Sequence, residues 1–170
     1  MPTPQDHYRR FARYNQWANT RLYDACAALP DGEFTRARPS FFGSLSATLN
    51  HVLVGDTVWM GRFTGEPTTI TSLDQTLHAE LASLRAAREA MDDRIVAFVD
   101  GLDAATLDAP LSYRTMAGTA STDPLEALLA HLFNHQTHHR GQAHGLLSLA
   151  GAAPPPLDLI YYLREVSRSS

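Results

Sequence analysis

The chain has 170 residues, which is enough for one domain with a substantial core, and we expect a single domain over residues 1–170. Its hydrophobic content of 44% and net charge of −4 are ordinary for a soluble globular protein. The chain is mildly acidic and has no cluster of arginines, which argues against nucleic-acid binding, and it lacks the run of about 18 apolar residues that a membrane-spanning helix needs.

Cysteine usage and the first residues of the chain bear on location. Cys26 is the only cysteine, so neither an intrachain disulfide nor a cysteine-based zinc site is possible. The first residues show no charged segment followed by an apolar one, as a secretory signal would. We therefore expect a cytoplasmic protein that does not associate with membranes.

Apolar residues at helical spacing predict two helices in the first part of the chain. The first runs from about Pro4 to Leu29, and the second runs from about Ser44 to Phe63. Thr3 and Asp6 have the spacing of a capping box, in which each side chain accepts a hydrogen bond from the other residue's backbone. These signals place the start of the first helix next to Thr3.

Two further helices are predicted in the second part of the chain. The third runs from about Ser72 to Val99, with Ser72 and Gln75 as another possible capping box. The fourth starts after Pro124 and runs to Ala150. Four long amphipathic helices of similar length are typical of an all-α four-helix bundle.

Two shorter segments complete the expected architecture. Residues 102–122 lie between the third and fourth helices, and the weak alternation of apolar residues there predicts an extended loop or a short β-hairpin. Residues 157–165 follow three consecutive prolines and are expected to form a short terminal helix. The predicted fold is thus a four-helix bundle with an irregular or hairpin insert before its last long helix.

A pair of histidines in the fourth helix is the clearest sign of function. His135 and His139 are four residues apart, so they project from one helical face with Cβ atoms about 5–6 Å apart. They lie on one helical seam with four leucines and one glutamine, namely Leu125, Leu128, Leu132, Gln142 and Leu146. Unpaired imidazoles in a core are costly, and a shared metal ion is the simplest partner for two of them.

A metal ion needs a third ligand, which should come from another helix. His131 lies one turn before His135, but three successive turns spread over about 12 Å of helix, too far for one ion. His138 points away from the pair. In the second helix, His51 falls at the flank of the apolar stripe and Asp56 falls on the stripe itself, so the helical wheel does not decide between them.

The sequence around the histidine pair resembles a known family. Residues 134–142, Asn-His-Gln-Thr-His-His-Arg-Gly-Gln, resemble the C-terminal signature of the DinB/YfiT-like superfamily of bacterial metalloenzymes. Residues 14–19, 49–59 and 155–164 resemble other segments of that superfamily, so the likeness covers nearly the whole chain. It implies a four-helix bundle, often dimeric, in which His51, His135 and His139 hold a metal.

The resemblance also implies a range of chemistries. Three neutral imidazoles suit Zn, Ni, Fe or Mn, and the ligands do not choose among them. Characterised relatives include metal-dependent hydrolases, transferases that use low-molecular-weight thiols, and a thiol-dependent maleylpyruvate isomerase. We therefore expect a metal-dependent hydrolase or thiol transferase that acts on a small molecule, and a homodimer. The alternative is a non-catalytic metal-binding or stress-associated protein with a structural metal. No catalytic residue can be named from the sequence.

Four other residues receive weaker assignments. Asp56 is expected to accept a hydrogen bond from the second ring nitrogen of a metal ligand, with a buried Arg or Trp as its alternative partner. Gln142 lies on the histidine seam, and we expect the substrate to enter beside the histidine pair, near Gln142 and the second-helix face around His51 and Asp56. Gly141 and Gly145 are expected to allow a neighbouring helix to approach closely.

Overall fold

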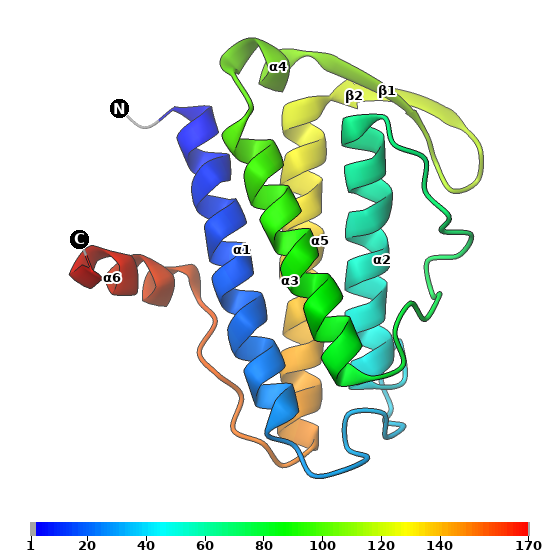
Figure 1. The fold of residues 1–170 in the computed structure, drawn as a ribbon, viewed down its shortest axis with the longest axis vertical. Helices are drawn as coiled ribbons and strands as arrows, with labels where there is room; N and C mark the ends of the chain where they lie inside the picture. Colours follow the sequence, from blue (N-terminus) through cyan, green and yellow to red (C-terminus); the bar gives the residue numbers. More distant parts are fainter. Residues whose placement is uncertain (1–2, 170) are drawn as a thin grey trace.

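Four long helices form the body of the protein (Figure 1). The structure is a computed structural model and describes residues 3–169. The long helices are α1 (Pro4–Ala27), α2 (Leu45–Thr64), α3 (Leu81–Asp100) and α5 (Leu125–Leu149). α1 and α5 begin at one end of the bundle, whereas α2 and α3 begin at the other (Figure 1). Each of α1 and α2 packs against both α3 and α5, so the all-α four-helix bundle expected from the sequence is confirmed.

The first two helices begin where their capping residues predict. The Thr3 hydroxyl accepts a hydrogen bond from the backbone N–H of Asp6, and the Asp6 carboxylate accepts one from the backbone N–H of Thr3, which completes the expected capping box. Ser44 caps α2 by accepting a hydrogen bond from the backbone N–H of Ala47. Gly65 ends α2 with a φ of 72°, a left-handed conformation that glycine adopts readily.

The third helix begins later than the sequence predicts, at Leu81 rather than near Ser72. The expected capping box is absent, because the Ser72 hydroxyl donates to Asp74 and the Gln75 side chain accepts from the backbone of Thr71. The segment before α3 is instead held to α2 by the buried Asn50 side chain, which accepts hydrogen bonds from the backbone N–H groups of Leu77 and His78. A tertiary contact therefore overrides the helical pattern of this segment.

A β-hairpin precedes α5, where the sequence predicts either an extended loop or a short β-hairpin. After the short helix α4 (Ala104–Asp108), strand β1 (Pro110–Arg114) pairs antiparallel with β2 (Ala120–Pro124). The hairpin extends over one end of the bundle beside the end of α2 (Figure 1). It therefore covers the part of the α2–α5 pair that lies beyond the histidines.

The last helix is α6 (Leu159–Ser169). It starts two residues later than the expected range of 157–165 and is longer than that range. This helix lies beside α1 and projects from the bundle (Figure 1). Its Tyr162 ring contacts the rings of Tyr14 and Trp17 on α1. Among residues 3–169, no helix combines the length and apolar character needed to cross a membrane.

Candidate metal centre

Three histidines from two helices converge between α2 and α5. The Nε2 atom of His51 on α2 lies 3.2 Å from the Nε2 atoms of both His135 and His139 on α5. One ring nitrogen from each of the three residues lies within 4.8 Å of the others. His51 and His139 are buried and His135 is partly buried, so this cluster could hold one metal ion inside the bundle.

Hydrogen bonds at the opposite ring nitrogens determine which form two of the rings take. Nδ1 of His51 lies 2.8 Å from the backbone carbonyl oxygen of Leu73, and Nδ1 of His139 lies 2.8 Å from the side-chain oxygen of Gln142. A carbonyl oxygen only accepts, so each Nδ1 carries a hydrogen and donates it. In the neutral rings, Nε2 then presents a lone pair.

The facing lone pairs make the cluster suitable for a cation. In the neutral forms, the Nε2 lone pairs of His51 and His139 approach to 3.2 Å with no hydrogen between them. Such an arrangement is repulsive unless a proton or a metal ion lies between the two nitrogens. Outer hydrogen bonds to carbonyl oxygens are also the usual way in which proteins orient histidines that bind metals.

Burial favours the neutral forms of His135 and His139. Desolvation, followed by the nearby ring of His139, lowers the pKa of His135 to about 3. Desolvation also lowers the pKa of His139, although its hydrogen bond to Gln142 opposes this effect. Because a protonated imidazole cannot bind a metal, these shifts keep the ligand form available at neutral and mildly acidic pH.

A glycine makes room for one of the histidines, and sequence reasoning missed it. A Cβ atom at Gly55 on α2 would lie 2.8 Å from Cε1 of His135, closer than such contacts allow. The available signal was a glycine in the interior of a predicted helix. The expectation for Gly141 and Gly145 is wrong, because a Cβ atom at either position would meet nothing within 4 Å.

An aromatic ring covers another side of the cluster. The Phe42 ring stacks on His51 with 4.2 Å between centroids and contacts His139 edge-on at 5.4 Å. Phe42 lies in the segment that leads into α2, outside every helical pattern in the sequence, so no periodicity pointed to it. The ring therefore packs directly against two of the three clustered histidines.

Asp56 does not contact a histidine; its partner is the alternative one, a buried arginine. The fully buried Asp56 carboxylate forms an ion pair with Arg88 on α3 and accepts a hydrogen bond from Gln136 on α5. Asp56 follows His51 by five residues, which turns it about 140° around the helix and away from the cluster. Burial raises the pKa of Asp56 to about 6, and Arg88 opposes that shift.

The ion pair belongs to a buried polar network that reaches all four long helices. Arg88 lies 2.9 Å from the carboxylate of Asp92, which also accepts hydrogen bonds from Asn15 and Asn19 on α1. Arg140 on α5 is buried and donates to the side-chain oxygen of Asn15 at 2.6 Å. Because Arg140 directly follows one of the clustered histidines, the network fixes the rotation of α5 that points them inward.

A cavity of about 460 Å³ reaches the cluster from the hairpin end of the bundle. Its wall includes His51, His135, and further residues of α2, α5 and the hairpin. Of the residues expected around the entrance, His51 and His135 line this cavity, whereas Asp56 and Gln142 do not. Gln142 instead lines an apolar groove beside Phe42, on the far side of the cluster.

The fold and the cluster together define a class: a helical bundle whose second and last long helices bring three histidines together. A sequence profile of the DinB family matches residues 1–167, and the chain belongs to that family.

The chain is similar to one curated protein in sequence and to one solved structure in fold. The chain is 28% identical over 156 residues to Protein DinB of Bacillus subtilis (strain 168), which covers 88% of this chain and 90% of that protein. It also resembles the crystal structure of a DinB-like protein from Bacillus cereus ATCC 10987, with a TM-score of 0.65 over 86% of this chain and 94% of the other. At 18% identity, this second likeness concerns the fold alone.

Proposed function

We propose that His51, His135 and His139 bind one divalent metal ion and that the protein is a metal-dependent enzyme acting on a small molecule. The observation that carries the proposal is the approach of the Nε2 atoms to 3.2 Å while the Nδ1 atoms of His51 and His139 donate elsewhere. Family membership supports it. Zn, Ni, Fe and Mn all suit three neutral nitrogen ligands.

Two features favour a catalytic ion over a structural one. Within residues 3–169, no carboxylate or thiol joins the three histidines, whereas a structural zinc site usually has four protein ligands. The cavity also gives a small molecule access to His51 and His135. The non-catalytic, stress-associated alternative lacks a comparable observation in its favour.

The chemistry we propose is hydrolysis or transfer at a small electrophile, with a low-molecular-weight thiol as the co-substrate in the second case. When bound, a divalent ion with three neutral ligands supplies Lewis acidity, which lowers the pKa of a coordinated water or thiol. The chain's own residues keep His135 and His139 neutral, orient the rings of His51 and His139, and pack Phe42 against both of those rings. The homodimer implied by the resemblance remains a prediction.

A metal-dependent activity screen tests this function. Untagged protein would be screened against pairs of low-molecular-weight thiols and electrophiles, and against ester and amide substrates. We expect an activity that chelation abolishes, that one added ion per chain restores, and that His135→Ala lacks. The variant His7→Ala, which alters an exposed histidine of α1, should keep the activity. An activity that persists in His135→Ala would contradict the proposal.

A further inference from the structure

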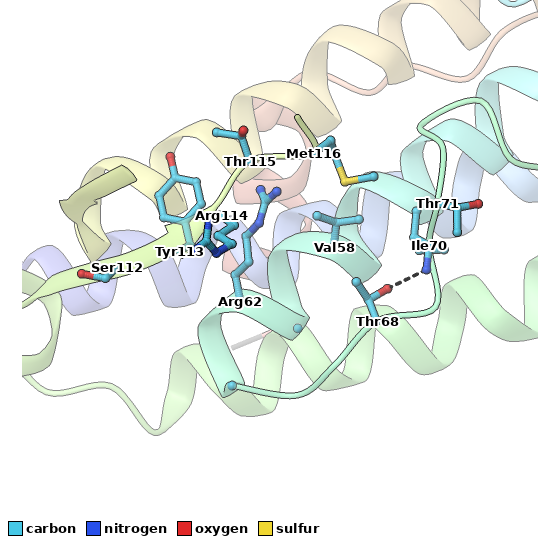
Figure 2. A pocket seen from close by; sticks show the side chains of 12 residues that line it. Val58, Arg62, Thr68, Ile70, Thr71, Ser112, Tyr113, Arg114, Thr115 and Met116 are labelled. Atoms are coloured by element: carbon cyan, nitrogen blue, oxygen red, sulfur yellow. Dashed lines mark hydrogen bonds between the residues drawn. The ribbon is translucent and has the colours of Figure 1, made fainter. Parts of the chain in front are cut away.

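Arg62 lies where two cavities meet below the hairpin. It lines the cavity that reaches His51 and His135, and it also lines a second one of about 600 Å³ between α2, the following loop and the hairpin. Figure 2 shows this second cavity, with Arg62 extending from α2 toward the hairpin between Tyr113 and Met116. A ligand in either cavity would therefore meet the guanidinium.

Two aromatic rings hold this guanidinium in place. Its central carbon lies 4.5 Å from the centroid of the Trp59 ring and 5.0 Å from that of the Tyr113 ring. The Tyr113 hydroxyl donates a hydrogen bond to Asp123 at 3.0 Å, which fixes that ring within the hairpin. The rings contact the guanidinium through their faces, so its N–H donors remain available for a planar acceptor.

Arg62 has no acidic partner among residues 3–169. Other arginines of the bundle do: Arg94 pairs with Glu66 at 2.8 Å, and Arg13 pairs with Asp100 at 2.8 Å. Arg62 is also partly buried, and a partly desolvated cation without a counter-charge is unfavourable. Its surroundings therefore favour the arrival of an anion.

Helix geometry sets the distance between this cation and the histidine cluster. Arg62 follows His51 by three turns of α2, about 16 Å along the axis. The Arg62 guanidinium lies over the ring of Trp59, about one turn nearer to His51 along α2, and both residues line the cavity that reaches the cluster. The Trp59 ring under Arg62 also contacts His131, with 5.1 Å between ring centroids, and the His131 ring lies 6.0 Å from that of His135.

We propose that Arg62 binds a carboxylate of the substrate or thiol co-substrate whose reactive group meets the metal ion. This inference rests on the proposed function above. One guanidinium balances one carboxylate and matches its two oxygens with paired N–H donors. The ligand class is accordingly an elongated small molecule, because Arg62 and His51 are about three helical turns apart, and it is held between the apolar side chains of Val58, Trp59 and Met116.

A matched series of thiols tests the proposal. Unbranched ω-mercapto carboxylates and ω-mercapto alcohols of the same chain length would be titrated into Zn²⁺-loaded protein by isothermal calorimetry. At the best chain length we expect the carboxylate to bind about tenfold more tightly than the alcohol, as for a hydrogen-bonded ion pair. Equal affinities at every length in the wild-type protein would overturn the proposal without reference to any variant.

Variants then assign the preference to one side chain. Arg62→Gln should bring the ratio of carboxylate affinity to alcohol affinity to about one. Arg62→Lys should give an intermediate ratio, because lysine keeps the positive charge but lacks the planar pair of N–H donors. Arg94→Gln, which changes an arginine outside both cavities, should keep the wild-type ratio. If Arg62→Gln kept the full preference for the carboxylate over the alcohol, the assignment to Arg62 would be overturned. It would also be overturned if wild-type protein bound an ω-mercaptoalkyl phosphate of the same chain length more tightly than the carboxylate.

Two further readouts separate this proposal from the metal assignment. Arg62→Gln should retain the metal content of the wild-type protein, whereas a protein that binds no metal contradicts the proposed function itself. In metal-free protein, unbranched alkyl carboxylates should change the fluorescence of Trp59, which lies under the guanidinium, and matched alcohols should change it less. Loss of this difference in Arg62→Gln, with Trp59 retained, is expected; its persistence would contradict the role of Arg62.

Discussion

At the scale of single residues, the site depends on the absence of a side chain at Gly55 as much as on the three histidines. The histidine pair could be predicted because two imidazoles interrupt an apolar seam at helical spacing. Gly55 could not, because its importance depends on which residue of α5 faces it, and a helical wheel of α2 does not contain that information. The partner of Asp56 could not be predicted for the same reason. Its place on the apolar stripe of α2 is compatible with either a histidine or an arginine partner.

The substitution Gly55→Ala tests the close approach. The new Cβ would lie 2.8 Å from Cε1 of His135, so we expect the ring to be displaced and metal affinity to fall about tenfold or more, while the helical circular dichroism is retained. A chelator competition titration measures this affinity. Gly141→Ala is the matched control, because nothing lies within 4 Å of a Cβ there. Equal affinities in the two variants would show that the contact has no role.

The depressed pKa of His135 predicts how acid affects the metal-free protein. The unfolded chain binds a proton near pH 6.5 and the folded one only near pH 3, so the unfolded state holds more protons between these values. The free energy of unfolding should therefore decrease as pH falls through this window. In His135→Gln, urea unfolding at pH 7, 6 and 5 should show a weaker dependence; an unchanged dependence would refute this origin.

At the scale of elements, the helices could be predicted from periodicity and capping, but the connection before α3 could not. The buried Asn50 side chain accepts hydrogen bonds from the backbone N–H groups of Leu77 and His78 and donates one to the carbonyl of His78. These are backbone groups that a helix starting near Ser72 would use itself. The contact joins residues far apart in sequence, so no local pattern reveals it. It also positions the segment that presents the Leu73 carbonyl to His51.

Asn50→Ala should loosen this connection. The three hydrogen bonds to this segment disappear together with one to the Ser46 carbonyl, and two partly buried N–H groups lose their acceptor, so we expect the free energy of unfolding to fall by roughly 1–3 kcal/mol. Amide hydrogen exchange at Leu77 and His78 should accelerate. Asn134→Ala, at an exposed position of α5, serves as the control. If exchange at Leu77 stays as slow as in the wild-type protein, the role given to Asn50 is wrong.

At the scale of the whole molecule, the bundle is stabilised separately from the metal centre. Leucine-rich clusters fill both halves of the interior, and the network around Arg88 joins all four long helices without involving the three histidines. The bundle itself was predictable from four amphipathic patterns. The network was not, since its members come from four separate helices and only their packing brings them together.

This separation predicts a metal-free protein that stays folded but melts at a lower temperature. A ligand that binds only the folded state adds about 2.7 kcal/mol when its free concentration is 100 times its dissociation constant. Circular dichroism of chelated protein should therefore show a helical spectrum at room temperature and a lower melting temperature, which returns on adding metal. Loss of the helical spectrum, or an unchanged melting temperature, would contradict this account.

The central claim is that His51, His135 and His139 hold one divalent ion, and metal content tests it most directly. Untagged wild-type protein, His135→Ala, His139→Ala and the control His7→Ala would be loaded with metal, desalted and analysed by elemental mass spectrometry. We predict one ion per chain in the wild-type protein and in His7→Ala, and loss of the ion in the other two variants. Full retention of the ion in either His135→Ala or His139→Ala would contradict the claim.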